Sequence, residues 1–359
     1  MRIGIDVRPL AYGMTGNSRY LAEVLELMLE RNKNISFIFF SNKPIHKMFL
    51  YLLKSNVTEE IERYPIPGPI YLNFILPNRL AKQKITKFWG TLQMLPYFKL
   101  PIPSFVNYHD LNFVSAPQTM AKWNYFQHLF FSPRTMRNAD GIFCLSENTK
   151  NEISKFHPEF ASKCKVIYPG VKKQKHEKEN LFPKPFFLTV GTLEPRKNLK
   201  ILLDAFLDFK KNNPKDKNTL VLMGRKGWGT EGEELYNTLK QLQNTNPSVF
   251  FLENPNDNIL TSAFAECRAF FFPSMHEGFG LPLLEAMVED KRCVASNIPV
   301  FKEILSEKCD LYVNANDLSG WSQAFEIMAK AKPGRIPKFK AKSWTWLETT
   351  KKIEESLGL

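Results

Sequence analysis

Short apolar runs alternate with helical stretches along the chain, and this alternation limits the choice of fold more than any other feature. In the first half we expect strands at residues 2–7, 35–40, 104–110 and 141–146. Residues 19–30 carry apolar side chains at helical spacing. The pattern is typical of an α/β chain with parallel sheets, in which ligands bind at the carboxyl ends of the strands.

The same alternation starts again after residues 169–185, a charged stretch bounded by prolines that is typical of a linker. Strands are expected at residues 186–191, 219–224, 249–252 and 269–274. A chain of 359 residues exceeds what one core usually supports. We therefore expect two Rossmann-like domains with a ligand-binding cleft between them.

Composition and cysteine usage narrow the class of protein. A hydrophobic fraction of 43% with 30 Phe excludes a disordered chain. No apolar signal region opens the sequence, and no run approaches the roughly 18 apolar residues of a membrane span. The cysteines are odd in number and form no CxxC pair, which argues against a zinc site and for a reducing compartment. We expect a cytoplasmic protein, either soluble or peripheral on the inner face of the cytoplasmic membrane. The cysteines are Cys144, Cys164, Cys267, Cys293 and Cys309.

The net charge of +13 lies mostly before residue 170. Such a field favours nucleic acid, an anionic membrane or anionic substrates. Nucleic acid is the weakest of these because no RRM, KH, zinc-finger or helix-turn-helix signature is present. Residues 79–98 mix cations with aromatic side chains, which suits an anionic membrane surface. An ordinary helix with a solvated face is the alternative. The side chains expected at a membrane are Arg79, Lys82, Lys84, Lys87 and Trp89.

Residues 273–287 read PSMHEGFGLPLLEAM, with Glu277 and Glu285 eight positions apart around a glycine turn. A carboxylate in a loop and a second one a turn into the following helix can face the same ligand. Backbone N–H groups near Gly278 and Gly280 are free to approach hydroxyl or phosphate oxygens. The run therefore predicts a polyhydroxylated ligand that carries phosphate.

Residues 189–199, TVGTLEPRKNL, place Arg196 and Lys197 at the entry of an expected helix. A guanidinium, an ammonium and a helix N-terminus together suit a diphosphate. A solvated basic turn with a structural Glu194 is the alternative.

These two motifs, with LMGRKGW, the early loop GMTGNSRY and the mid-chain YHD, resemble the retaining glycosyltransferases of family 4, which have the GT-B fold. One glycine-rich loop is common among nucleotide binders, but the motifs together in this order are specific. The resemblance implies domains at residues 1–170 and 171–342, and a helix at residues 343–359 that crosses back to the first domain. It implies transfer of a hexose, with mannose from GDP-mannose favoured, to a saccharide or lipid-linked acceptor in surface polysaccharide or lipopolysaccharide synthesis.

The resemblance also implies roles for individual residues. Glu285 would bind the ribose hydroxyls and Glu277 would lie beside the donor sugar. Arg196 and Lys197 would neutralise the diphosphate, with no metal ion or other cofactor expected. His109 would contact the sugar near the reacting carbon. Backbone contacts to the donor would come from Gly13, Gly16, Gly278, Phe279, Gly280 and Leu281.

The chain departs from the family pattern at several positions. Ser18 falls where relatives have a glycine, and His276 falls where many have an aromatic residue before the first acid. Glu253 replaces a glycine near the expected base site, which leaves the nucleobase open. Thr192 replaces an arginine found in some relatives.

Other functions remain open at this point. A phosphorylase or a sugar-nucleotide epimerase would share the fold, but the first needs a cofactor lysine motif and the second lacks the paired acids. A non-catalytic nucleotide-sugar-binding protein is the remaining alternative.

Overall fold

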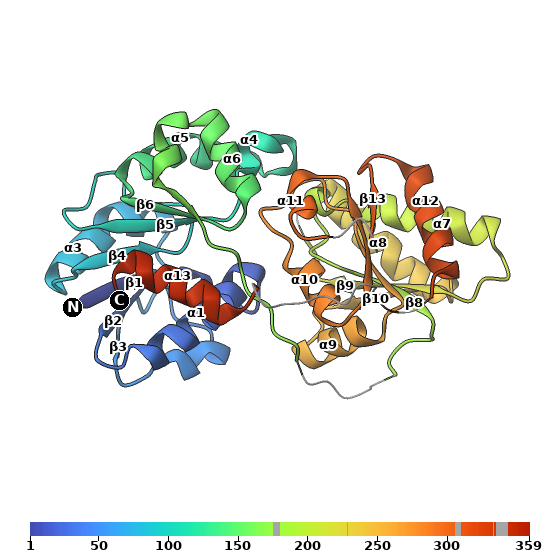
Figure 1. Ribbon diagram of the computed structural model, residues 1–359, viewed down its shortest axis with the longest axis horizontal. Helices are drawn as coiled ribbons and strands as arrows, with labels where there is room; N and C mark the ends of the chain where they lie inside the picture. Colours follow the sequence, from blue (N-terminus) through green and yellow to red (C-terminus); the bar gives the residue numbers. More distant parts are fainter. Residues whose placement is uncertain (175–179, 228, 306–309, 333, 335–343) are drawn as a thin grey trace. The chain divides into compact units, whose positions relative to one another are not determined.

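The computed structural model describes residues 1–174, 180–227, 229–305, 310–332, 334 and 344–359. The chain forms two compact units (Figure 1). Unit 1 comprises Met1–Val114, Lys122–Gly170 and the C-terminal helix, and unit 2 comprises Ser115–Ala121 and the described part of 171–341. The expected boundary at residues 342–343, together with His176 and Cys309, lies outside the described residues.

One detail of the domain prediction is wrong. The prediction assigned all of residues 1–170 to the first domain, whereas Ser115–Ala121 groups with unit 2. The alternation of strands and helices follows the order of the chain, so it cannot show that a short loop packs with a distant part of the sequence.

Unit 1 contains a parallel sheet in the order β3-β2-β1-β4-β5-β6-β7. Its central strands are buried on both faces, which explains their nearly continuous apolar sequence. The strands are β1 (Arg2–Asp6), β2 (Ser36–Ser41), β3 (Val57–Ile61), β4 (Lys87–Gly90), β5 (Ser104–Tyr108), β6 (Gly141–Cys144) and β7 (Cys164–Val166).

The first long helix of unit 1, α1, begins at Gly16 and is capped by Thr15. Ser18 donates and accepts the reciprocal bonds of a capping box with Thr15, so the serine that departs from the family pattern has a structural role. The helices are α1 (Gly16–Arg31), α2 (Gly68–Ile70), α3 (Leu76–Lys82), α4 (Asn112–Ser115), α5 (Lys122–Asn138), α6 (Glu147–Phe156) and α13 (Trp346–Leu357). A π-helical turn, η3 (Tyr71–Ile75), joins α2 to α3, and short 3-10 turns are η1 (Arg8–Ala11), η2 (Lys47–Leu52) and η5 (Pro158–Lys163). A further 3-10 turn, η4 (Pro117–Thr119), lies in the segment that groups with unit 2.

The C-terminal helix α13 packs on α1, although more than 300 residues separate them in the chain (Figure 1). Glu354 accepts hydrogen bonds from Arg31 Nε at 3.0 Å and from Asn32 Nδ2 at 2.6 Å. Trp346 packs edge-on against Tyr20, with 5.9 Å between ring centroids. The last helix is therefore a part of unit 1.

Unit 2 contains a parallel sheet in the order β10-β9-β8-β11-β12-β13. Alternate phenylalanines of β11 face opposite sides of the sheet, as strand geometry requires. Phe271 stacks on Phe325 of α12 at 4.2 Å, while Phe270 packs on Phe264 of α9. The strands are β8 (Phe186–Val190), β9 (Thr219–Gly224), β10 (Val249–Glu253), β11 (Ala269–Phe272), β12 (Arg292–Ser296) and β13 (Leu311–Val313).

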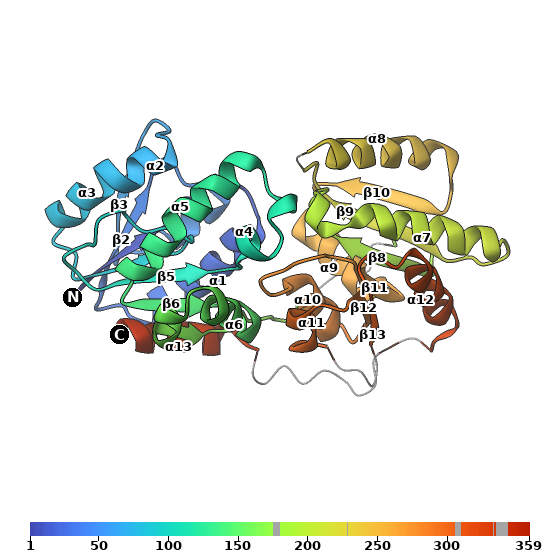
Figure 2. The same ribbon diagram turned by 90° about the horizontal axis from the view of Figure 1, so that it is seen from above.

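Helices cover both faces of this second sheet (Figure 2). Side chains from α7, α8 and α12 share one apolar core with the sheet. The helices are α7 (Leu199–Asn212), α8 (Thr230–Thr245), α9 (Asp257–Glu266), α10 (Leu281–Val288), α11 (Pro299–Lys302) and α12 (Leu318–Lys330), with a 3-10 turn, η6 (Pro195–Lys197), before α7.

Two glycines of the LMGRKGW motif are required because the backbone of another loop lies too close to them for a side chain. A Cβ on Gly224 would lie 1.8 Å from the carbonyl oxygen of Gly191, and one on Gly227 would lie 2.0 Å from that of Leu193. The motif thus packs directly against the loop that follows β8.

The proposed membrane-binding run at residues 79–98 is wrong in its structural basis. Trp89 lies in β4 rather than on a helix, is fully buried, and donates from Nε1 to Asn107 Oδ1 at 2.9 Å. Arg79 pairs with two glutamates and Lys87 bonds the carbonyl of Leu357. Of the five named residues, Lys82 and Lys84 are exposed.

No helix of the described residues is long and apolar enough to cross a membrane.

The Glu354 contacts predict a stability effect specific to α13. Glu354→Ala should lower the stability of unit 1 by about 1–3 kcal/mol, because it removes a buried carboxylate bonded to Arg31 and Asn32. Glu355→Ala is the matched control, since Glu355 is 75% exposed on the same helix. Thermal unfolding measures both variants, and equal midpoints for the two would contradict the assignment.

Candidate active site

The loops of the two motifs meet because the strands that precede them are neighbours. β8 pairs with β9 on one side and with β11 on the other, so the strand order reverses at β8. In open α/β sheets, ligands bind at the carboxyl ends of strands at such a reversal. The loop of residues 191–198 follows β8 and the loop of residues 273–280 follows β11.

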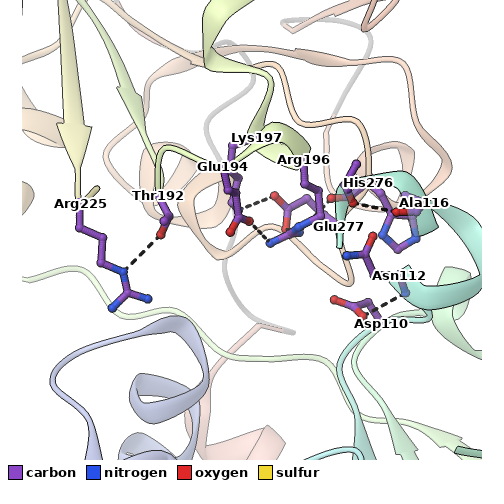
Figure 3. Close-up of polar contacts among 11 residues, drawn as sticks. Asp110, Asn112, Ala116, Thr192, Glu194, Arg196, Lys197, Arg225, His276 and Glu277 are labelled. Atoms are coloured by element: carbon purple, nitrogen blue, oxygen red, sulfur yellow. Dashed lines mark hydrogen bonds and ion pairs between the residues drawn. The ribbon is translucent and has the colours of Figure 1, made fainter. Parts of the chain in front are cut away.

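Glu277 bridges both cations of the first loop (Figure 3). Its Oε2 accepts from Arg196 Nη1 at 2.8 Å, and its Oε1 accepts from Lys197 Nζ. Burial alone would raise the pKa of this carboxyl, but Arg196 and Lys197 outweigh burial and lower its pKa to about 2. Glu277 is therefore ionised at neutral pH.

Glu194 is the second carboxylate of the cluster, and it accepts from Arg196 Nη2 at 2.7 Å. Burial raises the pKa of Glu194 and the nearby Glu277 adds to this, against the opposing effect of Arg196 and Lys197. The two acids thus share the guanidinium of Arg196, and the pKa of Glu277 is lowered while that of Glu194 is raised. The sequence predicted the basic pair but not that both acids would bind it.

Backbone contacts fix the conformation of the first loop. Asn198 adopts a left-handed conformation with φ of 53°, and its Nδ2 donates to the carbonyls of Pro273 at 3.2 Å and Ala315 at 2.7 Å. The N–H of Met275 donates to the carbonyl of Arg196 at 2.9 Å. Sequence reasoning missed Asn198; its signal was an asparagine between a basic turn and the start of α7.

The glycine turn lies between Glu277 and α10. Gly280 has φ of +124°, which side chains rarely adopt, and α10 begins at the next residue, Leu281. Phe279 is buried and Glu285 is half-buried on the second turn of α10. The predicted arrangement of one acid in a loop and one in the following helix is therefore the arrangement observed. It also places Gly278 in the loop.

A third cation, Arg225, lies beside the first loop. Arg225 Nε approaches Thr192 Oγ1 at 3.4 Å (Figure 3), at the position where some relatives carry an arginine. The sequence motifs predicted only Arg196 and Lys197 as the positive charges of the site, so Arg225 was missed. The arginine of LMGRKGW, directly after a strand, was the available signal.

Three predicted site residues lie in unit 1. His109 follows β5, and its Nε2 lies 2.9 Å from the carbonyl oxygen of Thr91, which requires Nε2 to carry the proton in a hydrogen bond. Burial lowers the pKa of His109 against the raising effect of Thr91 and Asp110. The ring is therefore neutral at physiological pH, with Nδ1 as its acceptor.

Gly13 lies in the loop before α1, whereas Gly16 is the first residue of that helix rather than part of the loop. A Cβ on either glycine would meet nothing within 4 Å. The folded chain itself leaves room for a side chain at both positions.

Among the residues that the structure describes, no group of three or more His, Cys, Asp or Glu side chains could hold a metal ion.

A sequence profile described as "Glycosyl transferases group 1" matches residues 171–324, which include all the site residues of unit 2. The O-antigen chain mannosyltransferase RfbU of Salmonella typhimurium is 29% identical over 238 residues, covering 65% of this chain and 63% of RfbU. Residues 171–324 of the chain are therefore similar to the group 1 glycosyltransferases. The serotype-specific mannosyltransferase WbdA of Escherichia coli is 34% identical over 177 residues, covering 49% of this chain and 21% of WbdA. The matches thus span less than two thirds of either relative's own length.

Solved structures agree on the fold of the chain. HepE of Anabaena, in complex with UDP and glucose, aligns with a TM-score of 0.74 at 17% identity, covering 100% of this chain and 99% of HepE. The lipopolysaccharide-biosynthesis glycosyltransferase WaaG aligns with a TM-score of 0.70 at 13% identity, covering 99% and 95%. The two parallel α/β domains are those of the GT-B fold.

The two carboxylates predict opposite dependences of stability on pH. Because the pKa of Glu277 is about 2, against an ordinary value of 4.5, its stabilising contribution is present above pH 4.5 and is lost as the pH falls toward 2. Because the pKa of Glu194 is raised, its contribution is present at low pH and is lost as the pH rises through that pKa.

The thermal midpoints of Glu277→Gln, Glu194→Gln and the wild type, measured as a function of pH, test these two dependences. Glu277→Gln should be less stable than the wild type at neutral pH, and this difference in stability should shrink as the pH falls. The stability of Glu194→Gln relative to the wild type should increase as the pH rises. If the two stability differences changed with pH in the opposite senses to these, the assignment would be refuted.

Proposed function

We propose that this chain is a retaining hexosyltransferase of family 4 that transfers mannose from GDP-mannose to a saccharide or lipid-linked acceptor. The bridging of Glu277 to Arg196 and Lys197, at the reversal of strand order, is the observation that carries the proposal. The mannosyltransferase relatives RfbU and WbdA support mannose and a place in surface polysaccharide synthesis. We expect the transfer to occur on the cytoplasmic side.

The leaving diphosphate is the first chemical requirement of such a transfer. Arg196 and Lys197 would stabilise its developing charge without a metal ion, through preorganised electrostatics. A guanidinium has five N–H donors and an ammonium has three, so each cation can bind phosphate while keeping its bond to Glu277. Arg225, beside Thr192, would add a third positive charge at the rim of the site.

The sugar and the nucleoside are the second requirement. Glu277 would accept hydrogen bonds from donor-sugar hydroxyls, since an ionised carboxylate has about four acceptor positions and Arg196 and Lys197 use two. Glu285 would bind the ribose hydroxyls, and backbone N–H groups of residues 278–281 would contact the sugar and the phosphate. The glycine at 280 supports this assignment, because its φ of +124° gives the turn a backbone conformation that other residues rarely adopt.

Residues of unit 1 would also contact the donor. The neutral His109 can accept a hydroxyl hydrogen bond through Nδ1, which suits contact with the sugar near the reacting carbon. We do not assign it as the general base, because in front-face retention the leaving phosphate takes the acceptor proton. The open space around Gly13 and Gly16 supports a close approach of the donor phosphate there.

A panel of nucleotides tests the donor. GDP should raise the thermal midpoint more than UDP, dTDP or ADP, and saturation at about 100 times its dissociation constant should stabilise the protein by about 2.7 kcal/mol. Glu285→Ala should reduce that stabilisation because it removes the ribose contact. A larger effect of UDP or dTDP would reject the GDP-mannose assignment while leaving the site in place.

Glu277→Gln tests the transfer site, since it keeps the side-chain shape and removes the charge. Release of GDP from GDP-mannose, with or without a saccharide acceptor, should fall by about 100-fold to 1,000-fold. Glu326→Gln is the matched control, because Glu326 is an exposed acid on α12 of the same unit. Unchanged turnover in Glu277→Gln, with the fold intact, would remove Glu277 from the site.

A further inference from the structure

Large apolar side chains are exposed together on unit 1, along helix α5 and beside it. Phe98 is 74% exposed, Phe74 is 73% and Phe130 is 65%. Exposed apolar side chains scattered singly are normal, but a connected set marks an interaction site. The aromatic face, as we call this set, consists of Phe74, Phe98, Trp123, Phe126, Leu129 and Phe130.

Its helical members lie on one side of α5. Trp123, Phe126 and Phe130 are spaced three and four residues apart, so they fall on the same face of the helix. The buried residues of α5 lie in its C-terminal half and are Ser132, Thr135, Met136 and Asn138. The N-terminal half of the helix thus directs its largest apolar side chains to solvent.

Tyr97 connects the helical members to Phe74 and Phe98. Its ring stacks on Phe130 at 6.1 Å and meets Phe98 edge-on at 5.3 Å. Its backbone N–H donates to Asn73 Oδ1 at 2.7 Å, which ties the chain next to Phe74 to the same place. The aromatic face is therefore continuous across three segments of unit 1.

The formal charges carried by helix α5 itself are positive. The helix contains Lys122, Arg134 and Arg137 and no acidic residue, while Asp110, outside the helix, acts on its His128. Arg134 lies over the Tyr97 ring at 4.8 Å and Arg137 is exposed. Aromatic side chains next to cations are the combination that binds an anionic lipid interface.

We propose that the aromatic face docks on the surface of an anionic lipid bilayer, with its rings in the headgroup region and the α5 cations against lipid phosphates. A second copy of the chain fits this surface less well, because two such helices would bring cations of like sign together. The proposal moves the membrane-binding surface from residues 79–98 to α5, keeping only Phe98 from the earlier run. It does not depend on which sugar the protein transfers.

Co-sedimentation with vesicles tests the docking. The wild-type protein should bind phosphatidylcholine vesicles containing phosphatidylglycerol at least about tenfold more tightly than vesicles of phosphatidylcholine alone, and added salt should weaken binding. Phe126→Ser with Phe130→Ser should lower binding to anionic vesicles by about tenfold or more. Both side chains are exposed, so the thermal midpoint should stay unchanged.

Two double variants serve as controls. Leu318→Ser with Ile327→Ser removes two exposed apolar side chains of unit 2 and should bind vesicles as wild type does. Lys82→Glu with Lys84→Glu should weaken vesicle binding less than the Phe126 and Phe130 double variant does, because we place the docking surface on α5. If the lysine double variant weakened binding more, the docking surface would lie at the end of α3 instead. Absence of vesicle binding by the wild type, or a dimer that the Phe126 and Phe130 changes dissociate, would overturn the proposal.

Discussion

The ionised carboxylate of Glu277 is the interaction on which the arrangement of unit 2 at its ligand edge depends. It holds two neighbouring cations that are themselves largely buried, and either cation without this partner would be costly to bury. The contact joins residues 80 and 81 positions apart in the chain, so it forms only when β8 and β11 lie side by side. The sheet, the two loops and the charges of the site are therefore one connected unit.

Several features of the fold could be predicted because parallel strands leave a strong signal. Buried strands such as β8 and β11 are short, continuous apolar runs, and the motif loops follow them directly. The spacing of Glu277 and Glu285 was enough to place one acid in a loop and one in α10. Spacing could not show that Glu277 and Glu194 both bind Arg196, since that depends on side-chain direction across two loops.

Within residues 79–98, the prediction that Trp89 faces a membrane is wrong for a physical reason. A mixture of cations and aromatic residues describes an exposed amphipathic surface and also a buried strand with a charged first residue. Residues 87–90 of this run form such a buried strand, because Phe88 and Trp89 belong to β4 and are buried in the core. Conversely, α5 has the composition of an ordinary amphipathic helix, and only the structure shows that Ser132 and Thr135 are buried while Phe130 is exposed.

The packing of α13 on α1 has a consequence for biosynthesis. Most of unit 1 precedes unit 2 in the chain, whereas the helix that supplies Glu354 and Trp346 to unit 1 follows unit 2. Domains generally fold as units, with the N-terminal one first during synthesis. Here the α1 surface stays uncovered until all of unit 2 has been translated, so unit 1 completes its packing only after unit 2 has been synthesised.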